Sequence, residues 1–193
     1  MPQNTEKVFA SSKMTTRTLT YCAMLAAVQV VLARLIIPMP AADTRFSLEA
    51  IPIVIAGLLF GPVAGGMVGF SADLVGCLFS GFGYNPLFCL PPILYGAFGG
   101  ILRYYVNQKP SFLRVLVTYA FPVILGSILW QSFMLAYVYN SDGEFMLSFL
   151  TKLSTRGVQF GICWPVEALI TTLLLKSGVF QTLKIWPPEK KAD

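Results

Sequence analysis

"RFSLEAIPIVIAGLLFGPVAGGMVGFSADLVG", residues 45–76, holds two apolar segments that are separated by the glycine- and proline-rich stretch "FGPVAGG" at 60–66. Each segment has the length of a short or tilted membrane span, and glycine and proline commonly mark the break between two elements. The stretch therefore predicts two membrane helices, at about 48–62 and 63–80.

The rest of the chain has the same apolar character. Hydrophobic residues make up 55% of the 193 residues and charged residues only 12%, and the mean hydropathy is +0.68. Four further apolar runs approach the length of a membrane span, at about 17–37, 86–107, 112–139 and 151–178. We therefore expect an all-α integral membrane protein, a compact bundle of six transmembrane helices that forms a single membrane domain over residues 1–193.

Positive charges predict the orientation of this bundle. Of the 14 Lys and Arg residues, ten lie before the first helix, around the connection between the fourth and fifth, or at the C-terminal end: Lys7, Lys13, Arg17, Arg103, Lys109, Arg114, Lys176, Lys184, Lys190 and Lys191. With six spans, these three places share one side of the membrane, which the positive-inside rule makes cytoplasmic. We expect a multi-pass protein of the cell membrane with both termini in the cytoplasm, whose first apolar run is a retained helix and not a cleaved signal peptide.

The other four cations would lie in the outer half of the bundle: Arg34, Arg45, Lys152 and Arg156. A basic mouth that faces outward suits an anionic ligand, so the net charge of +5 does not indicate nucleic acid binding. Acidic residues on the same side offer an alternative, local neutralisation: Asp43, Glu49, Asp142 and Glu144. That alternative is weakest for Arg156, which has only Gln159 and apolar neighbours nearby, because a charge at membrane depth usually faces a polar cavity or a partner.

One face of the last helix carries a polar stripe. Helical spacing brings together five residues on it: Lys152, Arg156, Gln159, Cys163 and Glu167. Asp73 is a second deep carboxylate, which either accepts hydrogen bonds from a ligand amine and ring N–H or pairs with Arg34. For Glu167, which lies toward the cytoplasmic half, a structural pairing is the favoured interpretation.

Aromatic side chains gather at the outer end. They flank the loop "SGFGYNP" (80–86) and follow the outer half of the fifth helix: Phe79, Phe82, Tyr84, Phe88, Trp130, Phe133, Tyr137 and Tyr139. Most are expected to face lipid or the membrane interface. A flat ligand would stack on a few of them, with Asn85 or Gln131 reading its polar edge, and Gly81 and Gly83 would let the loop act as a lid.

The chain lacks residues that several classes of protein need for their function. The chain has no histidine and no Walker motif, which argues against a histidine-based enzyme and against ATP binding by the chain itself. The four cysteines lie in apolar runs without paired spacing, so we expect no disulfide, metal site or cofactor: Cys22, Cys77, Cys89 and Cys163. A binding protein that borrows its energy is favoured, and a membrane scaffold subunit, whose polar residues pair among themselves, is the alternative.

Four stretches together resemble the S components of energy-coupling factor (ECF) vitamin transporters. They are "YCAMLAAVQVVLARLIIP" (21–38), "RFSLEAIPIVIAGLLFGPVAGGMVGFSADLVG" (45–76), "NPLFCLPPILYGAFGGIL" (85–102) and "FLTKLSTRGVQFGICWPVEALI" (149–170). Within that family they most resemble the folate-specific members. The resemblance implies a six-helix membrane subunit of a prokaryote that captures a vitamin from outside and is not an enzyme. It also implies as partners a membrane coupling subunit and two cytoplasmic ATPases.

The resemblance also implies roles for the polar residues. The dianionic glutamyl tail of folate would meet the basic mouth of Arg34 and Arg45, with Lys152 and Arg156 holding its carboxylates. The pterin edge would donate to Asp73, and the flat rings would stack on aromatic residues such as Tyr84. Further polar contacts would come from Asn85, Gln131 and Gln159. Pantothenate is the alternative ligand within the family, and because it has no aromatic system, the rings would then serve packing alone.

The first helix contains a strip of small residues in "AMLAA". Ala23 and Ala27 lie one turn apart in its cytoplasmic half and would let another helix approach closely. The same spacing recurs within the chain, so internal packing is one interpretation: Gly65 with Gly69, Gly96 with Gly100 and Gly157 with Gly161. The family resemblance implies the other, that Ala23 and Ala27 form the docking surface for the coupling subunit.

Overall fold

The computed structural model describes residues 15–34, 37–38, 45–79, 84–108, 110–138, 145–177 and 180. Most of these residues are helical, and two strands of two residues each pair with one another. In chain order the elements are α2 (Thr16–Arg34), β1 (Ile37–Pro38), β2 (Arg45–Phe46), α3 (Ala50–Phe60), α4 (Pro62–Leu78), the 3₁₀ turn η1 (Pro86–Phe88), α5 (Leu90–Ile101), α6 (Arg103–Gln108), α7 (Phe112–Phe121), the π-helix η2 (Pro122–Trp130), α8 (Gln131–Val138) and α9 (Phe145–Lys176).

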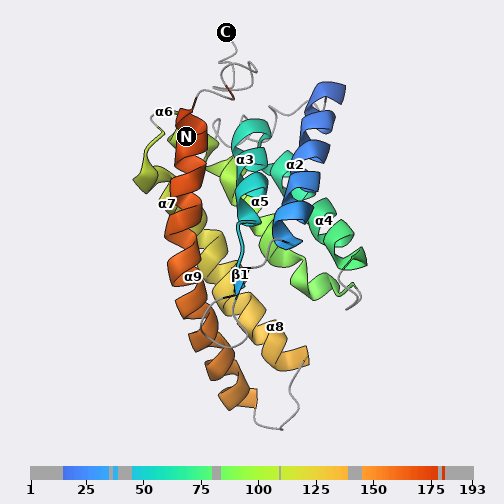
Figure 1. Cartoon of the computed structure of the whole chain (residues 1–193), viewed down its shortest axis with the longest axis vertical. Coiled ribbons are helices and arrows are strands. Elements are labelled where there is room, and N and C mark those ends of the chain that lie inside the picture. Colours follow the sequence, from blue (N-terminus) through green and yellow to red (C-terminus); the bar gives the residue numbers. More distant parts are fainter. Residues whose placement is uncertain are drawn as a thin grey trace, which may run out of the picture.

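The protein is an α-helical integral membrane protein, and the described residues form six helical segments that pack as one bundle (Figure 1). Three segments are long and apolar enough to cross a membrane: α2, the continuous run Phe112–Val138, and α9. The other three are shorter apolar segments, α3, α4 and η1 with α5. Outward-facing apolar side chains cover the bundle, as expected where lipid is the solvent. The sequence-based prediction of this fold class is confirmed.

The bundle has two ends of different character. We call the end that holds the α3–α4 turn at Gly61 the turn end, which lies at the top of Figure 1. The opposite end holds strands β1 and β2, which pair antiparallel as Ile37 with Phe46 and Pro38 with Arg45. We call it the hairpin end. Helix α8 and the first turns of α9 extend beyond the other helices there (Figure 1).

Helix α3 crosses only part of the bundle. Its 11 residues correspond to about 16 Å, roughly half of the hydrocarbon thickness. Every residue of α3 except Phe60 is buried, so this helix is enclosed on all sides. The chain before it is the β1–β2 pair, and non-helical backbone at membrane depth is stable where protein surrounds it or where it lines a cavity. Because α3 is short, the β1–β2 pair and not a helix occupies the hairpin end before it.

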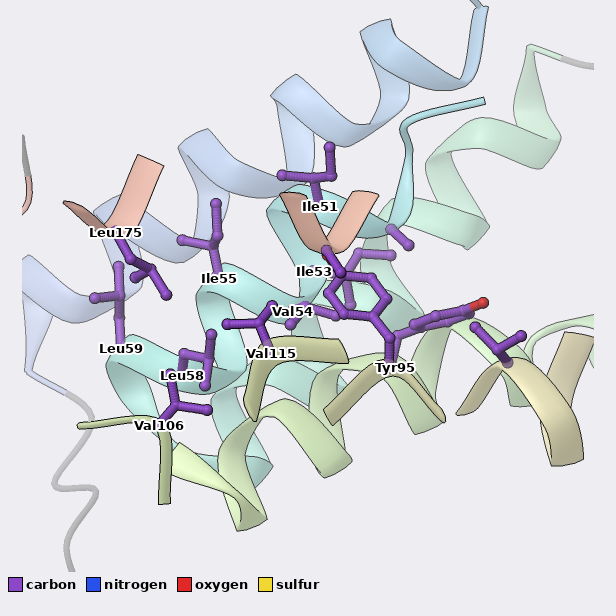
Figure 2. Packing of buried hydrophobic residues seen from close by; sticks show 14 residues of the cluster. Ile51, Ile53, Val54, Ile55, Leu58, Leu59, Tyr95, Val106, Val115 and Leu175 are labelled. Atoms are coloured by element: carbon purple, nitrogen blue, oxygen red, sulfur yellow. The ribbon is translucent and has the colours of Figure 1, made fainter. Parts of the chain in front are cut away.

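The core surrounds α3 (Figure 2). Side chains of α3 such as Ile53 and Leu58 pack against residues of α5, α7 and α9, among them Tyr95, Val115 and Leu175. Gly61 ends α3 with a positive φ of 100°, and Pro62 then starts α4. This is the break that "FGPVAGG" predicts.

Glycines bring α3, α4 and α5 into backbone contact. A Cβ added at Gly57 or Gly65 would collide with the carbonyl oxygen of Gly96, and one added at Gly100 would collide with the backbone of Pro62. The Gly65/Gly69 and Gly96/Gly100 pairs therefore serve internal packing. The Gly157/Gly161 pair does not, because no heavy atom of the described residues lies within 4 Å of a Cβ added at either position.

Predicted boundaries differ from the structure at three places. The first helix, predicted at 17–37, ends at Arg34, and Ile37 belongs to strand β1. Helix α9 begins at Phe145, six residues before the predicted start at 151, and the Thr151 hydroxyl bonds to the Leu147 carbonyl within the helix. The added residues 145–150, "FMLSFL", are apolar except for Ser148, so the apolar run itself begins before the predicted start. The segment predicted at 86–107 consists of η1, α5 and α6, with Leu102 separating the last two.

Candidate functional site

Arg156 and Gln131 meet at the hairpin end. The Nη1 group of Arg156 on α9 donates a hydrogen bond to Oε1 of Gln131 on α8, at 2.9 Å and partly buried. The two residues are 25 positions apart, and the sequence pointed to each separately. An arginine at this depth binds a polar partner, and its planar guanidinium has five donors, of which this bond uses one.

The π-helix η2 positions Gln131. The backbone N–H of Gln131 bonds to the carbonyl of Gly126, five residues earlier, which is the wide spacing of a π-turn. Such wide turns are often found at functional sites because they change the direction of the side chains that follow. The register of η2 thus decides which residue of α8 faces Arg156.

Lys152 and Gln159 lie on the same helix, about one turn on either side of Arg156. Both are half-buried, as is Arg156, and each has its own contacts. Strand β2, which contains Arg45, contacts α9 as well. The predicted stripe on α9 is therefore a polar wall at the hairpin end, with the β-strand pair beside it.

A second polar group joins the ends of α4 and α5. The buried Cys89 thiol lies within hydrogen-bonding reach of the Asp73 carboxylate and of the Tyr84 hydroxyl. Tyr84 is 43% exposed, and Asp73 is half-buried with an Oδ2 atom that is enclosed and has no hydrogen-bond partner. An enclosed acceptor without a donor is unusual and is where a ligand N–H could bind.

Arg34 has a different partner from the one considered from the sequence. Its Nη2 group donates to the carbonyl oxygen of Gly76 near the C-terminal end of α4, at 2.6 Å. A cation at a helix C-terminus is favourable because unpaired carbonyls and the helix dipole attract it. This contact ties α2 to α4 and places Arg34 one turn from Asp73, and the alternative of an Arg34–Asp73 pair is replaced by the Gly76 contact.

Asn85 has a structural role in the described contacts. Its Oδ1 accepts from the N–H of Leu87 at 3.1 Å and so caps η1. The Leu87 carbonyl accepts from Trp130 Nε1 at 2.8 Å, which joins η1 to the end of η2. The Asn85 amide N–H₂ is left to read a ligand edge, as the sequence-based hypothesis requires.

Some predicted residues lie outside the described residues: Asp43, Gly81, Phe82, Gly83, Tyr139, Asp142 and Glu144. The proposed lid at Gly81 and Gly83 is among them. For Arg45 the structure describes the backbone pairing with Pro38.

Glu167 was expected to make a structural pairing, and its contacts are with a helix end. The Ala50 N–H, the first of α3, donates to the Glu167 carboxylate, while Oε2 is buried without a hydrogen-bond partner. Cys163, one turn earlier on α9, similarly receives the N–H of Ser47. The role of Cys89 was also missed, since its apolar sequence context suggested packing.

Other possible sites have weaker support. The four cysteines are free thiols, and no metal-binding cluster occurs among the described residues. A shallow depression of about 220 Å³ between α7 and α9 is lined by apolar side chains, Phe112, Pro165, Val166 and Leu169. It lacks polar groups and opens where lipid would lie, so the polar hairpin end is the candidate ligand site.

Helix α2 carries the predicted docking strip. Ala23 and Ala27 are both exposed, as are the neighbouring apolar residues Met24, Val28 and Val31. Within the described part of the chain this face of α2 is not packed internally. It contrasts with the glycine strips of α4 and α5.

Comparisons with known proteins identify relatives. The family model for the ECF-type riboflavin transporter S component matches residues 13–177. The chain is 26% identical over 127 residues to "Folate transporter FolT" of Clostridium novyi (strain NT), covering 65% of this chain and 69% of that protein. It is 23% identical over 184 residues to "Folate transporter FolT" of Leuconostoc mesenteroides subsp. mesenteroides, covering 92% and 94%.

A solved structure has the same architecture. "Crystal structure of FolT bound with folic acid" matches with a TM-score of 0.69 and 26% sequence identity, covering 83% of this chain and 93% of that chain. The similarity therefore extends over most of both helical bundles.

Proposed function

This chain belongs to the family of ECF transporter S components, and we propose that it is the subunit that binds folate for import. The observation that carries the proposal is the Arg156–Gln131 pair, a partly buried cation on a polar wall at the hairpin end of a membrane bundle. Two relatives named as folate transporters and a folate-bound structural neighbour support folate among the vitamins.

The glutamyl tail of folate would bind on α9. Arg156 can offer a planar fork of donors to one carboxylate while Gln131 orients its guanidinium. Lys152 lies toward the hairpin end of the same helix and would hold the second carboxylate, with Arg34 and Arg45 adding positive charge nearby. Gln159, one turn deeper, would contact a polar edge of the ring system.

The pterin would bind toward α4 and α5. Its ring N–H and amine are paired donors, and the enclosed Oδ2 of Asp73 is an acceptor without a partner. Tyr84 supplies an exposed ring for stacking, and the Asn85 amide remains available as a donor. We propose that these groups surround a single bound ligand.

Import needs an energy source that other chains would supply. We propose a membrane coupling subunit that docks on the exposed Ala23/Ala27 face of α2, together with two cytoplasmic ATPases. The chain would act as one domain in a prokaryotic cell membrane, with both termini in the cytoplasm. The turn end would then face the ATPases and the hairpin end would face outward, where folate arrives.

Calorimetry with the purified protein in detergent tests this function. We expect one folate or reduced folate to bind per chain, with no ATP hydrolysis by the chain alone. The panel includes riboflavin, because the matched family model carries that name, and also pantothenate, thiamine and biotin. Binding of another vitamin with no folate heat would retain the family and refute folate.

The scaffold alternative makes a different prediction. A ligand that binds the folded state raises the melting temperature, by mass action. A protein whose melting temperature is unchanged by every vitamin of the panel would favour a scaffold role.

A further inference from the structure

The start of α3 has one local side-chain contact, in which the Ser47 hydroxyl accepts the Glu49 N–H at 3.3 Å, but this contact does not bind the Ala50 N–H. The first N–H groups of a helix have no partner within it and need acceptors, above all where the end is buried. Ala50 and Ile51 are each only 5% exposed. The preceding residue, Glu49, makes no side-chain cap, and Pro52 has no N–H to offer.

The missing acceptor comes from α9. The carboxyl group of Glu167, 117 positions along the chain, lies within hydrogen-bonding reach of the Ala50 N–H, and the Leu48 carbonyl receives the Ile51 N–H at 3.3 Å. A carboxyl oxygen is well suited to this place because the first N–H groups of a helix need an acceptor from outside the helix. Glu167 is 3% exposed, and burial of such a group is stable only with hydrogen-bond partners.

A second contact fixes the residues just before α3. The Ser47 N–H donates to the Cys163 thiol, one turn from Glu167 on the same face of α9. Two side chains of α9 therefore hold residues 47–50, the link between β2 and α3. The same face carries Gln159 and Arg156 further toward the hairpin end.

We propose that Glu167 is a positioning residue for ligand binding, which caps α3 across the bundle and so holds the β1–β2 pair against the polar wall of α9. This inference rests on the proposed function, because the wall is the proposed folate site. Glu167 lies about two turns from Gln159 along α9, and in this proposal it acts through the backbone of Ala50. Helix α9 would thereby position both sides of the site. It contributes the polar wall itself, and through the cap on α3 it positions the β1–β2 pair.

The test compares three variants in the full chain. Glu167→Leu removes the acceptor, and Glu167→Gln keeps an acceptor oxygen at the same distance along the side chain. Thr171→Val is the matched control, since Thr171 lies one turn further on α9, is fully buried and bonds to the Tyr119 hydroxyl at 2.8 Å. It removes a buried hydrogen bond of α9 without touching residues 47–50.

Two readouts are measured on folded, monodisperse protein. The first is the dissociation constant for folate, which we expect to rise about tenfold for Glu167→Leu and to stay within about threefold for the other two variants. The second is amide hydrogen exchange in peptides that cover residues 47–53, without ligand. We expect faster exchange there for Glu167→Leu alone.

The outcomes separate the possible failures. If Thr171→Val weakens folate binding as much as Glu167→Leu does, Glu167 contributes only to stability and the inference is overturned. Unchanged exchange of residues 47–53 in Glu167→Leu overturns it as well. A wild-type protein that binds no folate refutes the proposed function and with it the ligand role of Glu167, while the exchange measurement, which needs no ligand, still decides whether the cap exists.

Discussion

The turn end and the hairpin end of this bundle are held together by different interactions. At the turn end, α3, α4 and α5 approach backbone to backbone through Gly57, Gly65 and Gly100. At the hairpin end, long side chains join neighbouring elements, as Arg156 joins α9 to α8 and Trp130 joins η2 to η1. Backbone contacts leave no room for a ligand, whereas side-chain contacts can be exchanged for contacts with one.

This difference assigns separate tasks to the two ends. The glycine contacts make the turn end a scaffold whose shape is fixed by close packing. The polar contacts of the hairpin end offer donors and acceptors that a ligand could use, such as the guanidinium of Arg156 and the enclosed Oδ2 of Asp73. Substitutions should therefore impair folding at one end and binding at the other.

The largest effect is expected at the turn end. Gly100→Ala places a Cβ against the backbone of Pro62 and Gly61, which cannot move aside as a side chain can. We expect a loss of about 3 kcal/mol in the free energy of unfolding, or failure to fold. The matched control is Gly161→Ala, whose Cβ meets no atom within 4 Å and which should be neutral or stabilising by up to about 1 kcal/mol. Equal melting temperatures of the two variants would refute the scaffold interpretation.

The next largest effect is expected on the exposed face of α2. The substitution there leaves the turn end and the hairpin end intact. Ala27→Trp adds bulk on the exposed face of α2. We expect it to block assembly with the coupling subunit and folate uptake by cells, while folate affinity of the isolated protein stays unchanged. Leu129→Trp, on the exposed face of η2, is the control for bulk alone and should assemble normally. If Ala27→Trp loses ligand binding as severely as uptake, the strip packs internally.

At the hairpin end, Arg156 should matter more for binding than for folding. Arg156→Ala is expected to weaken folate binding by about ten- to a hundredfold, because a charge-assisted contact is lost. Arg156→Lys should restore only part of the affinity, since an ammonium lacks the planar fork. Both are measured by calorimetry beside a melting curve. Normal folate affinity with a lowered melting temperature would make Arg156 a structural residue.

The smallest effect is expected at Asp73. Asp73→Asn keeps one acceptor oxygen and removes the charge, so we expect folate binding to weaken by roughly three- to tenfold. Cys77→Ser, one turn further on α4, is a control that should leave the affinity unchanged. An Asp73→Asn variant that binds folate as tightly as the wild type would remove Asp73 from the site.

The sequence predicted much of the turn end and less of the hairpin end. The apolar runs and "FGPVAGG" predict the helices and the break at Gly61 because these signals are local. The face shared by Lys152, Arg156 and Gln159 also follows from helical spacing. The cap that Glu167 provides to Ala50 spans 117 positions and joins two unrelated segments, so no local pattern contains it. The early start of α9 was missed because the predicted span began at the polar residues Thr151 and Lys152, although the six residues before them are mostly apolar as well.

A structure of the protein with folate bound would show which end of the bundle holds the ligand. We expect the ligand at the hairpin end, enclosed by α8, α9 and the β1–β2 pair, with a glutamyl carboxylate on the Arg156 guanidinium and the glycine contacts of the turn end unchanged. Folate bound between α3, α4 and α5 at the turn end, or on the lipid-facing depression near Phe112, would contradict it.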